Sequence, residues 1–500
     1  MKYTRYFLIA AALVGGFSAQ ALDVTVAEPG SLFSQVENPA TETSLTVSGN
    51  IDATDFIFIA DNMPKLTTLN LQNAVIEDYS GKVLSTGVAK TADNTLPPFA
   101  LFGTNVSIVV LPSTITSIGD YALASTQLSS IDIPASVTTL GDGVFASTAL
   151  QRFVLPETVK TIGSGLFKDC KQLEEIALNQ NVTVLPPNTF AGCTALKYIT
   201  APAVVEIGQS ALSYCTSLVN YPFNESLKAI GDKAFYNSGI ISLNLTDEKK
   251  LEGIGNYAFA NCRQLTEAFL PEQLTNIGAG LFMGDAALTD ISVSSKLTAI
   301  PDYTYSGVAA LDTAAANKAI PLGVTSIGDF ALNGWQTIEV YRLPDNLESL
   351  GDYAMAGWKA LRELHAEGLT EVPQTGEDVW EGVDKQEVIL YITYDYTDLF
   401  KAADQWNEFK LDNSTSVDDI VADATASAID YCVIDGKLIV SSRGSEIVST
   451  TVFDLSGRRR FSKTGAEHTV AVNIADWTPG VYGVQVVLAD GVSEALKIRL

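Results

Sequence analysis

Apolar residues recur along most of the chain in a pattern that repeats every 22 to 27 residues. Each copy has an apolar residue followed by Gly or Pro, a large apolar residue four positions later, and usually a small residue three positions after that. A period of this length predicts a solenoid, in which stacked copies bury a continuous core that one copy could not form. The Gly and Pro positions, here called anchors, are Gly119, Gly141, Gly163, Pro186, Gly208, Gly231, Gly255, Gly278, Pro301, Gly328, Gly351 and Pro373.

Each copy also predicts one short strand. After the small residue the sequence alternates, so Leu128, Ile131 and Ile133 are expected to point inward. Asp132, between the two isoleucines, is expected to face solvent. A Pro commonly follows and ends the strand because it lacks a backbone donor. An exposed turn and two further inward-facing apolar residues then lead to the next anchor.

The outward slot of each predicted strand is where a solenoid would present a binding face. Small and polar residues dominate this slot, with neither a ladder of aromatic residues nor a row of cations. Val110, Val154 and Phe269 are apolar, but single exposed apolar residues are common on protein surfaces. The slot is filled, in chain order, by Asn70, Val110, Asp132, Val154, Ala177, Thr200, Pro222, Asn244, Phe269, Ser292, Ala315, Arg342 and His365.

The repeat consensus, I-G-x-x-A-F-x-x-C-x-x-L-x-x-I-x-L-P-x-x-V, resembles the BspA-like leucine-rich repeats of bacterial surface proteins. The resemblance covers Leu45 to Leu411. It implies a leucine-rich repeat solenoid with one strand and irregular or short helical segments in each repeat. The implied divisions are an N-terminal cap with the first irregular repeats at 22–100, BspA-like repeats at 101–383 and a C-terminal cap at 384–411.

Two departures from this consensus occur in the later repeats. Trp335 and Trp358 replace the small residue, and the unit that follows Pro301 is longer than the others. Regular stacking is therefore least expected between Leu311 and Trp358.

The first 21 residues have the composition of an export signal. Lys2 and Arg5 precede an uncharged apolar run, and a small-x-small motif ends at Ala21. This pattern predicts cleavage between Ala21 and Leu22, export through a Sec-type signal peptide, and a secreted or outer-surface location. The apolar run is too short for a permanent membrane span, and no later segment predicts a transmembrane helix.

The C-terminal part differs in composition from the repeats. Residues 412–428 are small, polar and acidic, as in a linker. Residues 429–500 alternate like strands between Gly-containing turns and predict a small all-β sandwich. The motifs "VFDLSGRR" (452–459), "PGVYGVQV" (479–486) and the terminal "KIRL" resemble C-terminal sorting domains of type IX secretion substrates in Bacteroidetes-like bacteria. A sandwich that only caps or spaces the solenoid is the alternative.

The net charge and the context of one glycine-rich segment argue against nucleic-acid and dinucleotide binding. The chain has 31 Lys and Arg against 58 Asp and Glu, a formal charge of −27, so phosphate backbones would repel it and no nucleic acid is expected. The segment "GIGNYA" (Gly253–Ala258) mimics a dinucleotide-binding motif, but Gly255 is an anchor and no βαβ unit surrounds it. We expect no cofactor.

Catalytic and metal-binding patterns are also lacking. The two histidines, His365 and His468, lie far apart in the sequence, which argues against a catalytic triad or a histidine-rich metal site. His365 is expected to be solvated or hydrogen-bonded. The linker residues Asp412, Asp418 and Asp419 lack the Gly and terminal Glu of a calcium-binding EF-hand loop.

Four of the five cysteines share the small slot of different repeats: Cys170, Cys193, Cys215 and Cys262. Strands stacked about 4.8 Å apart fall within the Cα separation of a disulfide, so a bond from Cys193 to one neighbour is an alternative. Thr or Ser fills the same slot elsewhere, which favours free, buried thiols. The spacings match no zinc motif.

These observations predict an exported, non-enzymatic binding protein. The family resemblance implies an adhesin-like role, with host, matrix or bacterial surface proteins or glycans as partners. A structural coat or spacer component of the cell envelope is the second hypothesis, and an enzyme is the third. The sequence does not identify the ligand-binding residues.

Overall fold

The computed structural model describes residues 21–393, 396–412, 429–434, 437–442, 445–454, 459–474, 477, 481–489 and 493–499. The predicted signal peptide up to residue 20 and the predicted linker beyond residue 412 lie outside these residues. The chain divides into two compact units, Met1–Arg362 with Pro373–Lys385 and Glu363–Val372 with Gln386–Leu500.

The first unit begins with a capping sheet and a helix. Helix α1 (Ala53–Asn62) starts at Asp52, whose side chain accepts the Thr54 N–H at 2.8 Å. The buried Asp55 carboxylate accepts backbone N–H groups of Gly30, Leu32 and Asp52, and so ties the 3-10 helix η1 (Leu32–Ser34) to α1. The parallel sheet runs in the order β1 (Leu22–Val26), β2 (Ser44–Ile51), β3 (Thr68–Ile76) and β7 (Ile108–Val110), with a hairpin of β4 (Tyr79–Ser80) and β5 (Lys90–Thr91) after β3.

One ladder of the repeats consists of three-residue strands, each paired in parallel with the equivalent strand of an adjacent repeat. The middle residue is buried, as in Phe153, Ile176 and Ile199, while the first and third residues point outward. The segment around Asp132 forms no such strand, although Asp132 is exposed as predicted. The strands in the first unit are β10 (Arg152–Val154), β12 (Glu175–Ala177), β14 (Tyr198–Thr200), β17 (Ser242–Asn244), β19 (Glu267–Phe269), β20 (Asp290–Ser292) and β23 (Val340–Arg342).

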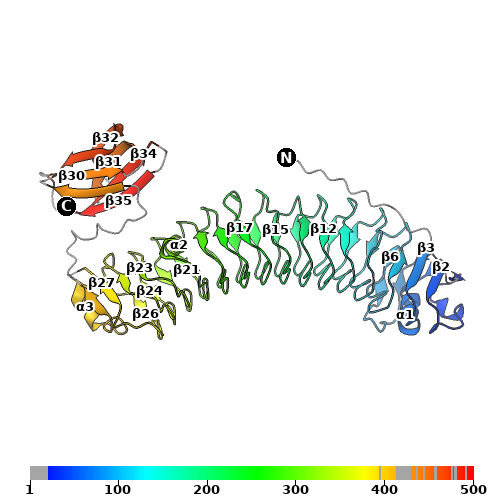
Figure 1. Cartoon of the computed structure of the whole chain (residues 1–500). Helices are drawn as coiled ribbons and strands as arrows, with labels where there is room; N and C mark the ends of the chain where they lie inside the picture. Colours follow the sequence, from blue (N-terminus) through cyan, green and yellow to red (C-terminus); the bar gives the residue numbers. More distant parts are fainter. Residues whose placement is uncertain are drawn as a thin grey trace. The chain divides into compact units, whose positions relative to one another are not determined.

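A second ladder consists of two-residue strands directly before the anchors, where the sequence predicted only a returning segment. Figure 1 shows strands of successive repeats side by side through the first unit. These strands are β6 (Thr95–Leu96), β8 (Ser117–Ile118), β9 (Thr139–Leu140), β11 (Thr161–Ile162), β13 (Val184–Leu185), β15 (Glu206–Ile207), β16 (Ala229–Ile230), β18 (Gly253–Ile254), β21 (Ala299–Ile300), β22 (Ser326–Ile327), β24 (Ser349–Leu350) and β26 (Gln374–Thr375).

The turn after each anchor forms a third ladder. In the repeat of Gly119, the N–H groups of Tyr121, Leu123 and Ser125 donate to carbonyls of the next repeat at 2.7, 3.2 and 2.7 Å. Tyr121 and Ser125 have φ of 55° and 57°, and the equivalent residues of the other repeats also have positive φ. A left-handed conformation costs a non-Gly residue about 1–2 kcal/mol, which the hydrogen bonds between repeats offset at about 1 kcal/mol each.

Close contact between backbones explains the anchors. A Cβ atom on Gly141 would lie 2.8 Å from the Asp120 backbone nitrogen, and one on Gly255 would lie 2.5 Å from that of Asp232. The residue after the anchor is often Asp, because its side chain links repeats: Asp120 Oδ1 accepts the Asp142 N–H at 2.8 Å. Gly therefore provides room, and Asp provides a cross-link.

The anchors differ from the prediction in two places, where one is shifted and one is added. Gln374–Thr375 pairs with Ser349–Leu350, so Gly376 and not Pro373 is the last anchor. The reason is again steric, because a Cβ atom on Gly376 would lie 2.6 Å from the Asp352 backbone nitrogen. At the other end, the Gly119 N–H donates to the Leu96 carbonyl at 2.8 Å, which makes Pro97 an additional anchor inside the segment predicted as a cap.

The core is a stack of aromatic rings. Phe145, Phe167 and Phe190 lie with centroids 5.4 and 5.6 Å apart, and burial of each Phe contributes about 1.5–3 kcal/mol. The predicted irregularity at Trp335 and Trp358 is not seen in the core. Their indoles stack at 5.4 Å, and their N–H groups donate to the carbonyls of Tyr305 and Leu332.

The long unit that follows Pro301 contains a helix in place of the predicted strand. Helix α2 (Thr313–Ala319) packs on β20 and β23, and Asp312 caps it by accepting the Ala315 N–H at 2.8 Å. Ala315, predicted to face outward, is 4% exposed. The prediction was wrong because the Ala-rich segment favours helix and packs its small side chains against the neighbouring strands.

The second unit contains the end of the repeat region and the C-terminal strands. Strands β25 (Glu363–His365), β27 (Ile389–Tyr391) and β28 (Lys410–Asp412) pair in parallel, with α3 (Thr397–Ala402) between the last two in sequence. The C-terminal strands are β29 (Ile429–Ile434), β30 (Lys437–Ser442), β31 (Ile447–Asp454), β32 (Arg459–Glu467), β33 (Thr469–Asn473), β34 (Val481–Leu488) and β35 (Ser493–Arg499).

The C-terminal strands form two antiparallel sheets. Their orders are β29-β30-β33 and β32-β31-β34-β35. Val440 and Val472 of the first sheet and Val452 and Val486 of the second belong to one buried cluster. None of the helices in the described part of the chain is long and apolar enough to cross a membrane.

Gly253 and Gly255, two residues apart in one repeat, provide a matched test of the steric role of the anchor. Gly255→Ala places its Cβ against the neighbouring backbone, so we expect a loss of about 1–3 kcal/mol in the free energy of unfolding. Gly253→Ala meets nothing within 4 Å and should be neutral or stabilise by up to about 1 kcal/mol. Denaturant unfolding of both variants measures this, and equal effects would contradict the steric explanation.

Candidate binding surface

Several repeats carry an exposed apolar side chain on the outward face of the three-residue strands. This face, called the strand face, carries two strongly exposed large residues, Val154 at 51% and Tyr198 at 66%. Val110 is also exposed there, and Val219 and Ile241 are exposed directly before the strand positions of two further repeats. Water-exposed apolar groups held on a hydrogen-bonded backbone favour binding of another surface.

Charges on the strand face are paired across repeats. Arg152 Nε lies 3.8 Å from the Glu175 carboxylate, and Lys197 Nζ lies 3.5 Å from that of Glu174. Exposed pairs of this kind contribute little to stability. They leave the face with both signs of charge close together, so its attraction for a partner rests on apolar contact.

The predicted outward slot corresponds to the third residue of these strands. Val110, Val154, Thr200 and Asn244 are exposed, as are Asp132 and Pro222 in the repeats without a strand. The remaining predicted positions are half-buried, apart from Ala315 in α2: Asn70, Ala177, Phe269, Ser292, Arg342 and His365.

The two-residue strands carry a different chemistry. Half of their outward residues are hydroxylated, and four of these bond in pairs: Thr95 Oγ1 lies 2.9 Å from Ser117 Oγ, and Thr161 Oγ1 donates to Thr139 Oγ1 at 3.3 Å. Val184, 40% exposed, is the large apolar residue that protrudes most from this ladder. A polar surface whose hydroxyls bond to each other offers a partner less than the strand face does.

A third surface feature is a stack of half-buried aromatic rings on the turns, two residues after the anchors. Tyr303, Phe330 and Tyr353 lie with centroids 5.1 and 4.9 Å apart and nearly parallel planes. The aromatic residue after "PD" or "GD" in these repeats is visible in the sequence, but a stack was not predicted because the strand slot alone was expected to form a binding face. The rings cover each other's faces, so the stack stabilises left-handed turns instead of presenting an open face to a sugar.

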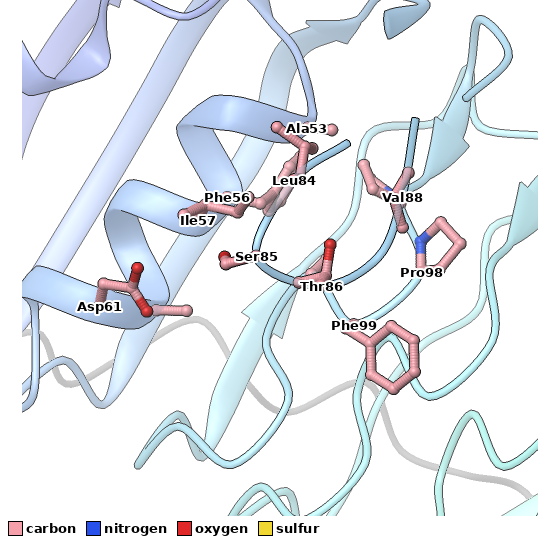
Figure 2. Close-up of a pocket in the computed structure, with 13 residues that line it drawn as sticks. Ala53, Phe56, Ile57, Asp61, Leu84, Ser85, Thr86, Val88, Pro98 and Phe99 are labelled. Carbon is pink, nitrogen blue, oxygen red and sulfur yellow. The ribbon is translucent and has the colours of Figure 1, made fainter. Parts of the chain in front are cut away.

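A small cavity lies in the cap, between α1 and the first turn. Figure 2 shows Phe56 and Ile57 of α1 near Leu84, Val88 and Pro98. Its volume of about 30 Å³ corresponds to a single water molecule. This cavity is too small for an organic ligand.

A wider hollow of about 420 Å³ lies beside the two-residue strands. Lys228, Lys249 and Lys250 line it together with Glu252. Gln273 closes one wall, because its Nε2 donates to backbone carbonyls of Glu248 and Leu251. The carboxylate among the lysines, with further acidic residues adjacent in sequence, leaves the hollow without a strong field for anions.

His365 is held by neighbouring carboxylates in the second unit. Its Nδ1 lies 2.8 Å from Glu367 Oε1 and its Nε2 lies 3.6 Å from the Glu363 carboxylate. The Tyr391 ring stacks on the imidazole at 4.6 Å. His468 is an exposed residue of another segment. Among the described residues, no three His, Cys, Asp or Glu side chains are placed to hold a metal ion.

The four repeat cysteines are free thiols in the structure. Each is buried, and each S–H donates to a backbone carbonyl of the preceding repeat, as Cys193 does to Phe167 at 3.1 Å. Burial raises the pKa of Cys170 to about 11 and that of Cys215 to about 12. The alternative of a Cys193 disulfide is therefore not what the structure contains.

Comparison with protein families finds six copies of the BspA type leucine-rich repeat region, over residues 94–215, 184–312 and 312–375. These matches span more than half of the chain. A search of curated proteins finds no match.

Solved structures are also similar. A leucine-rich repeat protein from Bacteroides ovatus shares 20% identity over 70% of this chain and 84% of that chain, with a TM-score of 0.56. One from Eubacterium ventriosum shares 16% identity over 66% and 84%, with a TM-score of 0.42. The pneumococcal vaccine antigen PcpA shares 16% over 70% and 84%, with a TM-score of 0.35. The first match shows the fold, and the predicted leucine-rich repeat solenoid is confirmed.

Thiol alkylation tests the buried cysteine ladder. The thiolate is the reactive form, and a pKa near 11 in place of 9 lowers its amount about 100-fold. We expect iodoacetamide at pH 8 to label Cys170, Cys193, Cys215 and Cys262 at least about 100-fold more slowly in the native chain than in the denatured chain. Peptide mass mapping gives the rate at each site. Equal rates, or a peptide cross-linked through Cys193, would contradict the structure.

Proposed function

Because the chain belongs to the BspA-type leucine-rich repeat family, we propose that it is an exported binding protein of the cell surface or medium, adhesin-like in action. It recognises a partner with the strand face of its repeats and carries out no chemistry. The observation that supports this proposal most directly is the exposed apolar set of Val154, Tyr198, Val219 and Ile241 on that face.

A rigid array suits such a role. The strand face is fixed by backbone hydrogen bonds between repeats, so little ordering entropy is lost when a partner binds. Exposed aromatic residues such as Tyr198 are common centres of binding energy in protein interfaces. The protruding side chains are mostly branched aliphatic ones, which favours a surface protein of a host, a matrix or another bacterium over a glycan as the partner.

Export belongs to the same proposal. We infer cleavage of the signal peptide between Ala21 and Leu22, which is supported by the start of β1 at Leu22, directly after the cleavage motif. Residues 429–500 would then serve as a sorting-like or spacer domain. The sequence motifs support this role, and part of each motif lies outside the described residues.

Alanine variants of the mature chain, residues 22–500, test the binding face. We expect Val154→Ala with Tyr198→Ala to weaken binding by at least about tenfold, because truncation of central apolar contacts costs about 1–2 kcal/mol each. Binding is measured by biolayer interferometry against immobilised matrix proteins and proteins of host and bacterial surface extracts.

A matched control pair exists on the other ladders. Val184 is 40% exposed on the two-residue strands and Tyr214 is 49% exposed on the turns. Val184→Ala with Tyr214→Ala should leave the dissociation constant unchanged. Loss of binding in this pair alone would move the site off the strand face. Self-association of the mature chain with no binding in the whole panel would favour the coat or spacer hypothesis.

A further inference from the structure

A row of buried donors links successive repeats through the core. In six repeats, the side chain seven residues after an anchor donates to the carbonyl of the residue four after the preceding anchor. In each of these repeats the row satisfies one buried carbonyl, and both thiols and indoles serve as the donor. The pairs are Cys170 to Phe145, Cys193 to Phe167, Cys215 to Phe190, Cys262 to Phe235, Trp335 to Tyr305 and Trp358 to Leu332, at 2.9 to 3.3 Å.

Asp285 occupies this donor position in the repeat of Gly278. It is 0% exposed, and both of its carboxyl oxygens lack a hydrogen-bond partner among the described residues. By the spacing of the other repeats, the carbonyl of Phe259 is the expected partner of this side chain. An ionised carboxylate cannot donate to a carbonyl, and a buried unpaired charge is strongly unfavourable.

We propose that Asp285 is a protonation latch: as a neutral acid its hydroxyl donates to the Phe259 carbonyl, as the thiols and indoles of other repeats do to theirs, and loss of that proton opens the solenoid at this repeat. Deprotonation leaves two oxygens with lone pairs facing each other in the core. Water must then enter to solvate the charge, which separates the repeats of Gly255 and Gly278.

The surroundings of Asp285 favour the neutral form. The equivalent positions of the adjacent repeats hold the Cys262 thiol on one side and the aliphatic Val308 on the other. Burial raises the pKa of Asp285 well above its usual value, and the backbone of Cys262 lowers it by less. Burial also raises the pKa of Cys262, and the Asp285 charge raises it further. The thiol is thus the titratable group coupled to Asp285, and it stays neutral.

The direction of the pH dependence follows. In the unfolded chain an Asp ionises near pH ~3.9, whereas the folded chain holds the proton to higher pH. The latch therefore stabilises the fold fully below pH ~4. Its contribution declines as the pH rises toward the folded pKa. The repeat that opens contains β20 and precedes α2, so the opening interrupts the strand face.

Variants of the mature chain with the latch removed provide the test. Asp285→Asn keeps a donor without titrating, and Asp285→Cys introduces the residue that the preceding repeat has at this position. We expect the melting temperature of the wild type to fall between pH 5 and pH 9 by at least about 3 °C more than that of either variant. Asp132→Asn, at an exposed carboxylate, should keep the wild-type profile. Parallel profiles for the wild type and Asp285→Asn would overturn the latch.

Hydrogen exchange of the wild type tests the latch without any variant. After correction for intrinsic rates, peptides covering residues 278–300 should lose protection as the pH rises from 6 to 9, while those covering residues 141–163 keep it. Constant protection of residues 278–300 over this range would overturn the proposal, even if the variants fail to fold.

Discussion

The close approach of each repeat's backbone to the next is the constraint on which the rest of the structure depends. Three ladders share it: the two strand series and the turn, where N–H groups of alternate residues reach the next repeat at 2.7 to 3.2 Å in the repeat of Gly119. This approach requires Gly or Pro at the anchors and left-handed residues on either side of the large core residue. Since every repeat relies on its neighbours for these bonds, the repeats are stable only as an array.

The same constraint gives each side of the array its own chemistry. Core positions are fixed by ring stacking and by donors such as Cys193, so they cannot vary freely. Outward positions are not constrained by core packing. On the two-residue strands, outward side chains form hydroxyl bonds between repeats, and on the turns, outward aromatic rings stack. The strand face alone combines protruding apolar groups with paired charges, which is why the proposed binding role belongs there.

Asp285 is the titratable acid in a row whose other cross-repeat donors are thiols and indoles. Those groups provide a donor at any ordinary pH. A carboxyl provides one only with its proton attached. The proposed latch therefore arises from the packing constraint itself, since the same side chain on an exposed strand would ionise without consequence.

The sequence by itself determined the repeat, its period, the large core residues and most anchors, because each of these is imposed by contacts that recur identically in every copy. It also placed Val154 on an outward slot. Only the tertiary structure decided the second strand series, the shift of the last anchor from Pro373 to Gly376, the burial of Ala315 and the exposure of Tyr198 and Ile241. These features depend on which backbone lies beside which, and a single repeat read along the chain does not contain that information.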